Sequence, residues 1–251
     1  MQELSKEKLK DLRKLRLKKF RDEKKQVLVE GSRTIRQLIT DRVSLSELYC
    51  LESAVKSYTD ILEHIGSERI YVLKEHQIEQ LTAAKSAQNI IALVECRVPD
   101  FRKMDRLVYI DRISDPGNLG AIFRNARATG MDGVILSPEC SDIFNPKTVR
   151  ASVGTLFSLP SKVSEFEQLQ GLDKEIIITD SEKGEPLFSF PLPENGYILV
   201  LGSEAFGVDR RIVAKADRRI RIPMLNRVES LNVAVAAGLC MYRLNRDILT
   251  K

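Results

Sequence analysis

Two patterns of hydrophobic residues alternate along the chain. Short, nearly continuous apolar runs predict buried strands, and apolar residues that return every third or fourth position predict amphipathic helices. The two kinds of segment alternate from residue 27 onward, which is the pattern of an α/β protein. A segment rich in proline and charge interrupts the alternation at residues 97–105, and we place a domain boundary there, near Pro99. The expected domains are residues 1–98 and 99–251.

The first part of the chain predicts a small α/β domain with its own core. Its expected strands are residues 27–31, 45–51, 69–73 and 90–96. A basic helix is expected ahead of the first strand, and further helices are expected from Ser32 onward, at 59–65 and at 75–81.

The second part predicts a larger sheet. Its expected strands are residues 107–111, 133–137, 174–180, 197–201 and 218–222. The runs at 174–180 and 197–201 are apolar almost throughout, as strands are when helices cover both faces of a parallel sheet. One expected helix ends at Gly130, and a second begins at Asn145-Pro146. A third spans residues 208–216, and a fourth is the alanine-rich helix near the C-terminus. We therefore expect a parallel α/β sheet of about six strands.

The composition is that of an ordinary globular protein, with 43% hydrophobic and 30% charged residues. No apolar run approaches the roughly 20 residues that span a bilayer, and the first residues carry no apolar signal region, so we expect a cytoplasmic protein without a membrane segment. The four cysteines are scattered, and neither His64 nor His76 lies at metal-ligand spacing from any of them. We expect neither a metal site nor a disulfide framework.

The positive charge is concentrated at the N-terminus. Residues 1–25 contain eleven Lys or Arg and five Asp or Glu, a balance of +6, whereas the whole chain carries +5. A basic leading segment suits a polyanion such as RNA, because each phosphate that it neutralises releases counterions. The alternative is a solvated amphipathic helix, since Leu9 and Leu12 follow helical spacing.

Three of the expected strands lead into a short polar loop and then a helix. The residues of these loops that can bind or turn are Asn118 and Gly120, then Gly202, Glu204 and Gly207, then Asn226, Glu229, Ser230 and Asn232. Because parallel strands end at the same edge of a sheet, the three loops suggest one pocket. Gly117 and Gly120 are wrongly spaced for the dinucleotide motif G-x-G-x-x-G, and the chain has no Walker loop, which makes NAD a poor ligand for this pocket.

Each of these residues also has a structural explanation. Asn118 could cap its helix, and Ser230 or Asn232 could cap the last helix. Glu204 could stabilise the N-terminus of the helix expected after Gly207. In the same way, Ile222 and Leu231 could be core residues, Gly202 a turn glycine and Arg124 a surface arginine.

The loops nevertheless carry three ordered motifs. They are N-x-G-x-x-x-R at Asn118, Gly120 and Arg124; L-G-x-E-x-x-G at Leu201, Gly202, Glu204 and Gly207; and a third at Ile222, Pro223, Ser230, Leu231, Asn232, Val233 and Ala236. Through them, residues 105–247 resemble the SpoU family of RNA 2′-O-ribose methyltransferases. The phrases Leu-Val-Glu-Gly and Ile-Ile-Ala-Leu-Val-Glu are similar to those of the ribosomal-protein-like substrate-binding domain that many members carry ahead of the methyltransferase domain.

The resemblance implies a deep trefoil knot in the second domain and S-adenosyl-L-methionine as the cofactor. The resemblance implies that the cofactor is bound by Leu201, Gly202, Ile222 and Leu231 in the motifs, and by Thr179 in a less distinctive loop after the strand 176–178. The residues expected to line the reacting region are Asn118, Arg124, Glu204, Ser230 and Asn232. A guanidinium, with a pKa above about 12, surrenders its proton reluctantly, so we expect Arg124 to clamp a phosphate beside the target ribose rather than act as a base.

The expected partner is RNA, and the added N-terminal domain favours ribosomal RNA by analogy with the family. Residues expected to contact the RNA are Arg124, Arg127, Arg150 and Arg227. The family also implies a homodimer. Two alternatives stay open: an RNA-binding ribosome assembly factor that kept the fold and lost activity, and a transfer RNA ribose methyltransferase.

Overall fold

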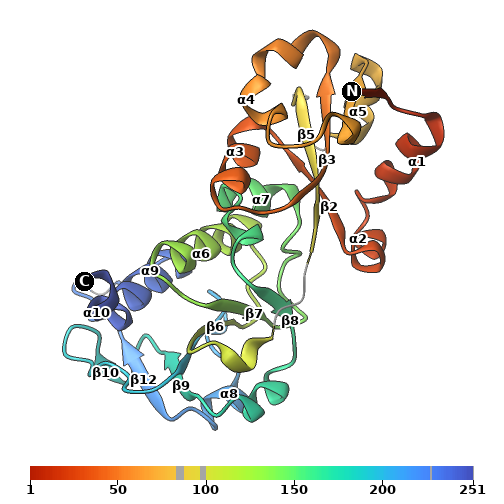
Figure 1. Cartoon of the computed structure of the whole chain (residues 1–251). Helices are drawn as coiled ribbons and strands as arrows, with labels where there is room; N and C mark the ends of the chain where they lie inside the picture. The colour runs from red at the N-terminus through yellow and green to blue at the C-terminus, as the bar shows by residue number, and fades with distance from the viewer. Residues whose placement is uncertain (83–87, 97–99, 227, 251) are drawn as a thin grey trace. The chain divides into compact units, whose positions relative to one another are not determined.

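Figure 1 shows the chain as a computed structural model that describes residues 1–82, 88–96, 100–226 and 228–250. Its contacts form two compact units, Met1–Arg97 with Val153–Ser158, and Val98–Ser152 with Leu159–Lys251. The expected boundary near Pro99 lies outside the described residues. Both units are α/β, as the alternating hydrophobic periods predict.

The first unit contains a mixed five-stranded sheet in the order β1-β4-β3-β5-β2. Its strands are β1 (Gln2–Glu3), β2 (Gln26–Glu30), β3 (Leu45–Leu51), β4 (Ile70–Leu73) and β5 (Ile90–Glu95). β4 is parallel to β1 and β3, whereas β5 is antiparallel to β2 and β3. The four expected strands are present, and β1 is too short to show any period in the sequence.

The helices of the first unit are α1 (Lys6–Lys14), α2 (Lys18–Lys24), α3 (Ser32–Thr40), α4 (Thr59–Leu62) and α5 (Glu75–Leu81), with short 3₁₀ turns at Glu52–Ser57 and Ser67–Arg69. The basic segment thus forms two helices rather than the single one expected. Leu9 and Leu12 of α1 are buried, Lys6, Lys10 and Arg13 are exposed, and Lys8 contacts Glu47 and Tyr71 of the sheet. Arg21 of α2 is buried and donates to the carbonyls of Leu15 and Arg16, where the chain turns between the two helices.

The second unit contains a seven-stranded sheet in the order β10-β12-β9-β11-β6-β7-β8, and every pair is parallel. Its strands are β6 (Arg106–Ile110), β7 (Gly133–Leu136), β8 (Ser161–Val163), β9 (Glu175–Thr179), β10 (Glu185–Pro186), β11 (Tyr197–Leu201) and β12 (Arg218–Arg221). The five expected strands are the five longest of these. β8 and β10 are the two edge strands, and each is too short for a periodic signal.

Helices cover both faces of this sheet. The helices are α6 (Pro116–Ala128), α7 (Pro146–Ser152), α8 (Arg210–Val213), α9 (Val233–Leu244) and α10 (Arg246–Leu249), with 3₁₀ turns at Phe101–Lys103 and Phe166–Leu172. A further 3₁₀ turn at Thr155–Phe157 belongs to the first unit. In Figure 1, α6 and α9 lie on one side of the sheet, and α8 lies on the other. The expected covering of both faces is therefore present, although α8 is shorter than the segment 208–216 predicted as a helix.

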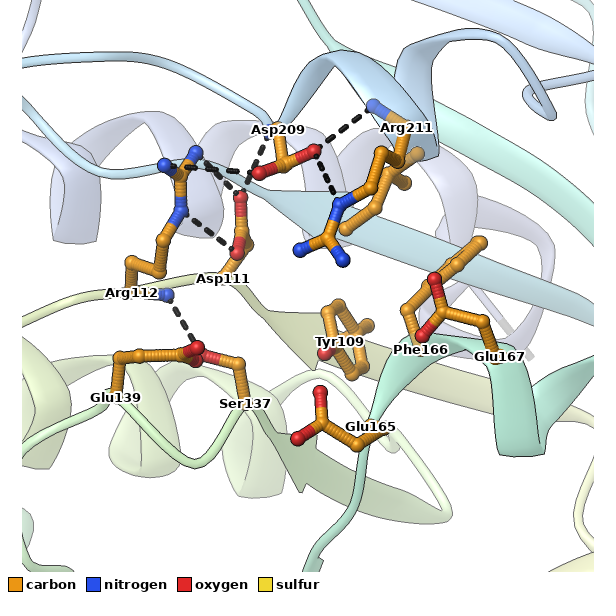
Figure 2. A pocket seen from close by; sticks show the side chains of 11 residues that line it. Tyr109, Asp111, Arg112, Ser137, Glu139, Glu165, Phe166, Glu167, Asp209 and Arg211 are labelled. Carbon is orange, nitrogen blue, oxygen red and sulfur yellow. Dashed lines mark hydrogen bonds and ion pairs between the residues drawn. The ribbon is translucent and has the colours of Figure 1, made fainter.

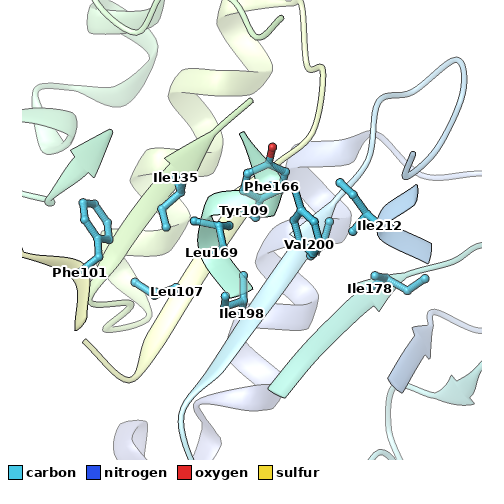
Figure 3. Packing of buried hydrophobic residues seen from close by; sticks show 10 residues of the cluster. All are labelled: Phe101, Leu107, Tyr109, Ile135, Phe166, Leu169, Ile178, Ile198, Val200 and Ile212. Carbon is cyan, nitrogen blue, oxygen red and sulfur yellow. The ribbon is translucent and has the colours of Figure 1, made fainter. Parts of the chain in front are cut away.

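The core on the α8 side of the sheet is built from alternate strand residues (Figure 3). Leu107 and Tyr109 of β6, and Ile198 and Val200 of β11, face this layer because successive side chains of a strand point to opposite faces. They pack against Phe166, Leu169 and Ile212, and the Phe166 ring meets the Tyr109 ring edge-on at 5.4 Å between centroids.

Close helix packing fixes α6, whose first turn carries Asn118. A Cβ added to Gly120 would stand 2.5 Å from the carbonyl oxygen of Thr148, so only glycine lets α7 approach this closely. Farther along α6, the Asn125 amide donates to the carbonyl of Ala234 in α9 at 2.8 Å. The two contacts hold α6 between α7 and α9. None of the helices in the described ranges combines the length and apolar character needed to cross a bilayer.

Candidate active site

Three loops of the second unit meet at the carboxyl edge of its sheet. The first joins β6 to α6, the second runs through residues 202–209 between β11 and α8, and the third joins β12 to α9. Because the strands are parallel, their carboxyl ends lie at one edge. The loops are those that carry the three sequence motifs.

Asn118 connects all three loops by its side chain. Its Nδ2 donates a hydrogen bond to Glu204 in the 202–209 loop, and its Oδ1 accepts one from Nδ2 of Asn232 at 2.9 Å. Asn118 is half-buried, whereas Glu204 and Asn232 are exposed. Residues separated by 86 and 114 positions in the chain therefore form one polar set that a ligand can reach.

The structural explanation for Asn118 is wrong, because Asp115 caps α6 in its place. The Asp115 Oδ1 accepts the main-chain N–H of Asn118 at 2.8 Å, and its Oδ2 accepts a hydrogen bond from Lys147 at 2.9 Å. The pKa of Asp115 is held below its usual range, first by the hydrogen bond from Lys147 and then by the one from the main-chain N–H of Asn118. The Asn118 side chain is thereby left for Glu204 and Asn232.

Helix α9 is capped by Asn232, as the structural explanation for that residue expected. Its Oδ1 accepts from the main-chain N–H groups of Ala234 and Val235 at 3.0 and 3.3 Å, while its Nδ2 reaches Asn118. One side chain therefore caps α9 and joins the polar set. Glu204 does not serve α8, which begins at Arg210 and is capped by Asp209.

A cavity of about 370 Å³ opens beside this polar set, within the size range of small-molecule sites. Its lining includes four of the five residues expected to bind the cofactor, namely Thr179, Gly202, Ile222 and Leu231. Glu204 and Ser230, expected to line the reacting region, also border it. The fifth expected cofactor residue, Leu201, ends β11 with its side chain fully buried and is not among the described residues that line the cavity.

The 202–209 loop is too tight to hold a side chain at its first residue. A Cβ on Gly202 would stand 2.2 Å from both the carbonyl carbon of Gly207 and the main-chain nitrogen of Val208. Ser203 and Gly207 exchange main-chain hydrogen bonds of 3.1 and 2.9 Å, which closes the loop on itself. Gly202 is thus both a turn glycine and part of the cavity wall.

A charged network lies at the base of this loop, around a second, smaller pocket (Figure 2). Asp111 and Arg112, directly after β6, contact Asp209 at the end of the loop. The hydrogen bond with Asp111 raises the pKa of Arg112, and hydrogen bonds from Arg211 lower the pKa of Asp209. Sequence reasoning missed this network, although the charged pair that ends the apolar run at 107–110 is a visible signal.

The arginines expected to contact RNA are accessible where the structure describes them. Arg124 and Arg127 are exposed on α6, and Arg150 is exposed on α7. Arg227, the fourth, lies outside the described residues. In the part of the chain that the structure covers, no group of three or more His, Cys, Asp or Glu side chains is arranged to hold a metal ion.

Comparison with known proteins identifies the second unit. Residues 105–242, more than half of the chain, match the SpoU rRNA Methylase family. The chain belongs to this family. Residues 6–92 match the MRM3-like substrate binding domain, so the SpoU domain follows a domain of a second described type.

Similar proteins cover nearly the whole chain. The 23S rRNA (guanosine(2553)-2′-O)-methyltransferase RlmP of Bacillus subtilis is 31% identical over 95% of this chain and 96% of its own. The AdoMet-bound rRNA methyltransferase from Sinorhizobium meliloti superposes with a TM-score of 0.82 at 26% identity, covering 99% of this chain and 97% of its own. AviRb from Streptomyces viridochromogenes, a SpoU methyltransferase solved with AdoMet, shares the fold at a TM-score of 0.81 and 24% identity, over 98% and 99% of the two chains.

Proposed function

We propose that the protein methylates the 2′-hydroxyl of a ribose in RNA, with S-adenosyl-L-methionine as the methyl donor and ribosomal RNA as the substrate. The observation that carries the proposal is the hydrogen-bonded set of Asn118, Glu204 and Asn232, which joins three family motifs beside a ligand-sized cavity. The similarity to a protein named as a 23S rRNA 2′-O-methyltransferase supports the reaction, and that to an AdoMet-bound methyltransferase supports the cofactor.

The cavity has the chemistry that S-adenosylmethionine needs. Ile222, Met224 and Leu231 supply apolar contact for an adenine ring, and the bare Gly202 lets a ligand approach the main chain of the 202–209 loop. With Thr179 at the end of β9, these are the residues that we propose hold the cofactor. When bound, the cofactor supplies an electrophilic methyl group.

The polar set has the geometry to orient the ribose. The Glu204 carboxylate already accepts a hydrogen bond from Asn118, and it can accept another from a ribose hydroxyl at the exposed side of the loop. Ser230, across the same cavity, offers a hydroxyl that can donate or accept. Because neither a carboxylate such as that of Glu204 nor a hydroxyl such as that of Ser230 is basic enough to deprotonate ribose in advance, we infer that in-line positioning supplies most of the rate and that the proton leaves late.

Arg124 is the proposed phosphate clamp. It is exposed on α6, within two turns of Asn118 along the same helix. A guanidinium binds phosphate through two parallel hydrogen bonds, which fixes the position of the ribose next to it. Arg127 and Arg150 add cationic side chains on α6 and α7, and we propose that they and Arg227 contact the RNA.

The first unit is proposed to recognise the RNA. Its N-terminal helices present exposed cations, among them Lys6, Lys10, Arg13, Lys18 and Lys19. The match of residues 6–92 to a described substrate-binding domain supports this role. Binding to phosphates predicts that affinity falls steeply with salt.

A homodimer is part of the proposal. Val235, Leu239 and Tyr242 lie on one face of α9 at helical spacing, and each is more than 40% exposed. Three large apolar side chains in a row on a helix favour burial against a second copy of the chain. Ribosomal RNA as the substrate implies that the dimer acts in the cytoplasm.

A methyl-transfer assay on RNA tests the function. Purified protein with S-adenosylmethionine that carries a labelled methyl group should label ribosomal RNA from cells that lack this protein, and the label should map to one ribose. Asn118→Ala should remove most of the labelling while the fold is kept. Cofactor binding without transfer to any bulk RNA would favour an inactive assembly factor, and labelling of transfer RNA alone would favour the transfer RNA enzyme.

A further inference from the structure

The base of the 202–209 loop is joined to β6 through one buried carboxylate. Asp111 follows the last residue of β6, and its side chain is only 4% exposed. Its Oδ2 accepts the main-chain N–H of Asp209 at 2.8 Å, and its own N–H donates to the carbonyl of Leu201 at 2.8 Å. Asp111 therefore contacts the chain at both ends of the loop.

Arg112 extends this connection to the middle of the loop. Its Nε and Nη2 donate to the two carboxylate oxygens of Asp111 at 3.1 and 3.0 Å, the bidentate geometry that fixes a guanidinium most firmly. The same Nη2 donates to the carbonyl of Gly207 at 3.3 Å, and Nη1 lies 3.8 Å from Asp209. Figure 2 shows the guanidinium beside the two carboxylates, with dashed lines to both.

The backbone of Arg112 is held in an uncommon conformation to make these contacts. Its φ is +56°, in the left-handed region that few residues other than glycine adopt. The Ser137 hydroxyl accepts the Arg112 N–H at 3.0 Å and so secures the turn from the side of β7. Non-glycine residues in this region concentrate where the surrounding structure requires a particular geometry.

We propose that Asp111 and Arg112 are positioning residues that hold the 202–209 loop in its closed form. With the loop closed, Gly202 keeps its place in the cavity wall and Glu204 reaches Asn118. The tip of the loop at Glu204 and Phe206 is exposed, so its position depends on how its base is held. The inference rests on the proposed function for the identity of the ligand, but the constraint on the loop is a property of the chain alone.

The test replaces Arg112 in the full-length chain. Arg112→Met should weaken the binding of S-adenosylhomocysteine about tenfold in calorimetry, as expected for the loss of charged hydrogen bonds that order a binding loop. It should also lower the rate of methyl transfer at saturating cofactor, because Glu204 is no longer fixed. Arg112→Lys should recover part of both effects, since its ammonium can reach Asp111 but cannot form the fork.

A second readout does not depend on any ligand. The amide hydrogens of residues 202–209 should exchange faster with deuterium in Arg112→Met than in the unchanged protein, while those of β6 should not. If Arg112→Met fails to fold, Arg112→Gly serves instead, because glycine adopts positive φ without strain. A wild-type protein that binds no S-adenosylhomocysteine counts against the proposed function, whereas unchanged exchange in the loop overturns the positioning role.

The matched control is at the other end of the same strand. Arg106 forms a comparable two-point contact with Asp132, through hydrogen bonds of 3.2 and 2.9 Å. Arg106→Met should lower the melting temperature without changing cofactor affinity or the exchange of residues 202–209. If Arg106→Met and Arg112→Met weaken cofactor binding equally, Arg112 acts only through global stability and the proposal is wrong.

Discussion

The two ends of the parallel sheet in the second unit use similar residues in opposite ways. At the amino end, a buried amide and a half-buried ion pair find their partners within the protein. Asn245 is 1% exposed, donates to the carbonyl of Thr129 at 2.8 Å and accepts from the Tyr197 hydroxyl at 2.6 Å. Arg106 and Asp132 close the same end.

At the carboxyl end, the side chains of the polar set beside the cavity are paired as well, but two of the three are open to solvent. Glu204 and Asn232 are exposed while they contact Asn118, and a cavity opens beside them. Hydrogen bonds between solvent-exposed polar groups contribute little to the stability of the fold, because water competes for the same groups. Such groups can instead form hydrogen bonds with a ligand. We therefore expect changes at the amino end to alter stability and changes at the carboxyl end to alter binding and reaction.

The largest effect should come from Gly202→Ala. The added methyl would collide with the main chain of Gly207 and Val208, which cannot move without opening the loop. Affinity for S-adenosylhomocysteine should fall about a hundredfold or more, since both the cavity wall and the place of Glu204 would be lost. Gly171→Ala is the control, because its added Cβ meets nothing within 4 Å. Wild-type affinity in Gly202→Ala would show that the loop does not form the cofactor site.

Arg124→Lys should have the next largest effect and should act on RNA alone. Lysine keeps the charge but loses the planar fork, so kcat/KM for RNA should fall about ten- to a hundredfold. Cofactor affinity should stay unchanged, because Arg124 is not among the described residues that line the cavity. Steady-state kinetics, with the RNA and then the cofactor as the varied substrate, separates the effect on RNA from any effect on the cofactor. Near-full turnover in the lysine variant would rule out bidentate clamping.

At the amino end, Asn245→Ala should lower stability and leave the reaction intact. The substitution leaves the Tyr197 hydroxyl and the Thr129 carbonyl buried without the partner they now share, which costs about 2–4 kcal/mol in the free energy of unfolding. Urea denaturation measures the loss, and the rate per folded molecule should equal that of the unchanged protein. An unaltered free energy of unfolding would mean that water replaces the amide at this end too.

Much of the fold follows from hydrophobic period, because long strands and helices repeat their pattern several times. All nine expected strands are present, whereas β1, β8 and β10, of two or three residues, are too short to repeat anything. The order of the strands in each sheet does not follow from the hydrophobic period. The period indicates which face of a strand is buried, but not which strand is its hydrogen-bonded neighbour. The trefoil knot implied by the family resemblance stays a prediction.

The site could be predicted only as a set of residues. The motifs indicate Asn118, Glu204 and Asn232, but neither the hydrogen bonds that join them nor the capping of α6 by Asp115 follows from spacing. The role of Arg112 is hidden for the same reason: its contacts with Gly207 and Asp209 cross about a hundred residues of chain. Long-range contacts depend on how strands are ordered, which local sequence does not encode.

The smallest expected effect is a difference between two carboxylates, Asp132 and Asp115, in how their contribution to stability depends on pH. Burial opposes ionisation of Asp132, but hydrogen bonds from the Arg106 side chain and main chain outweigh it, and its pKa in the folded protein lies below the usual value. Its contribution to stability is therefore complete above the unfolded pKa of about 3.9 and is lost as pH falls through the lower folded pKa. Asp132→Asn should cost about 1 kcal/mol at pH 7, and this difference should shrink below about pH 4.

Asp115 at the carboxyl end gives the contrast. Its pKa is also lowered, first by Lys147, but its side chain is 45% exposed and Asn is an equally good N-cap. Asp115→Asn should therefore change the free energy of unfolding less than Asp132→Asn at pH 7, and show a weaker pH dependence in urea titrations between pH 3 and 7. A larger loss for Asp115 than for Asp132 would mean that the carboxyl end is stabilised as strongly as the amino end, and that its exposure is no sign of function.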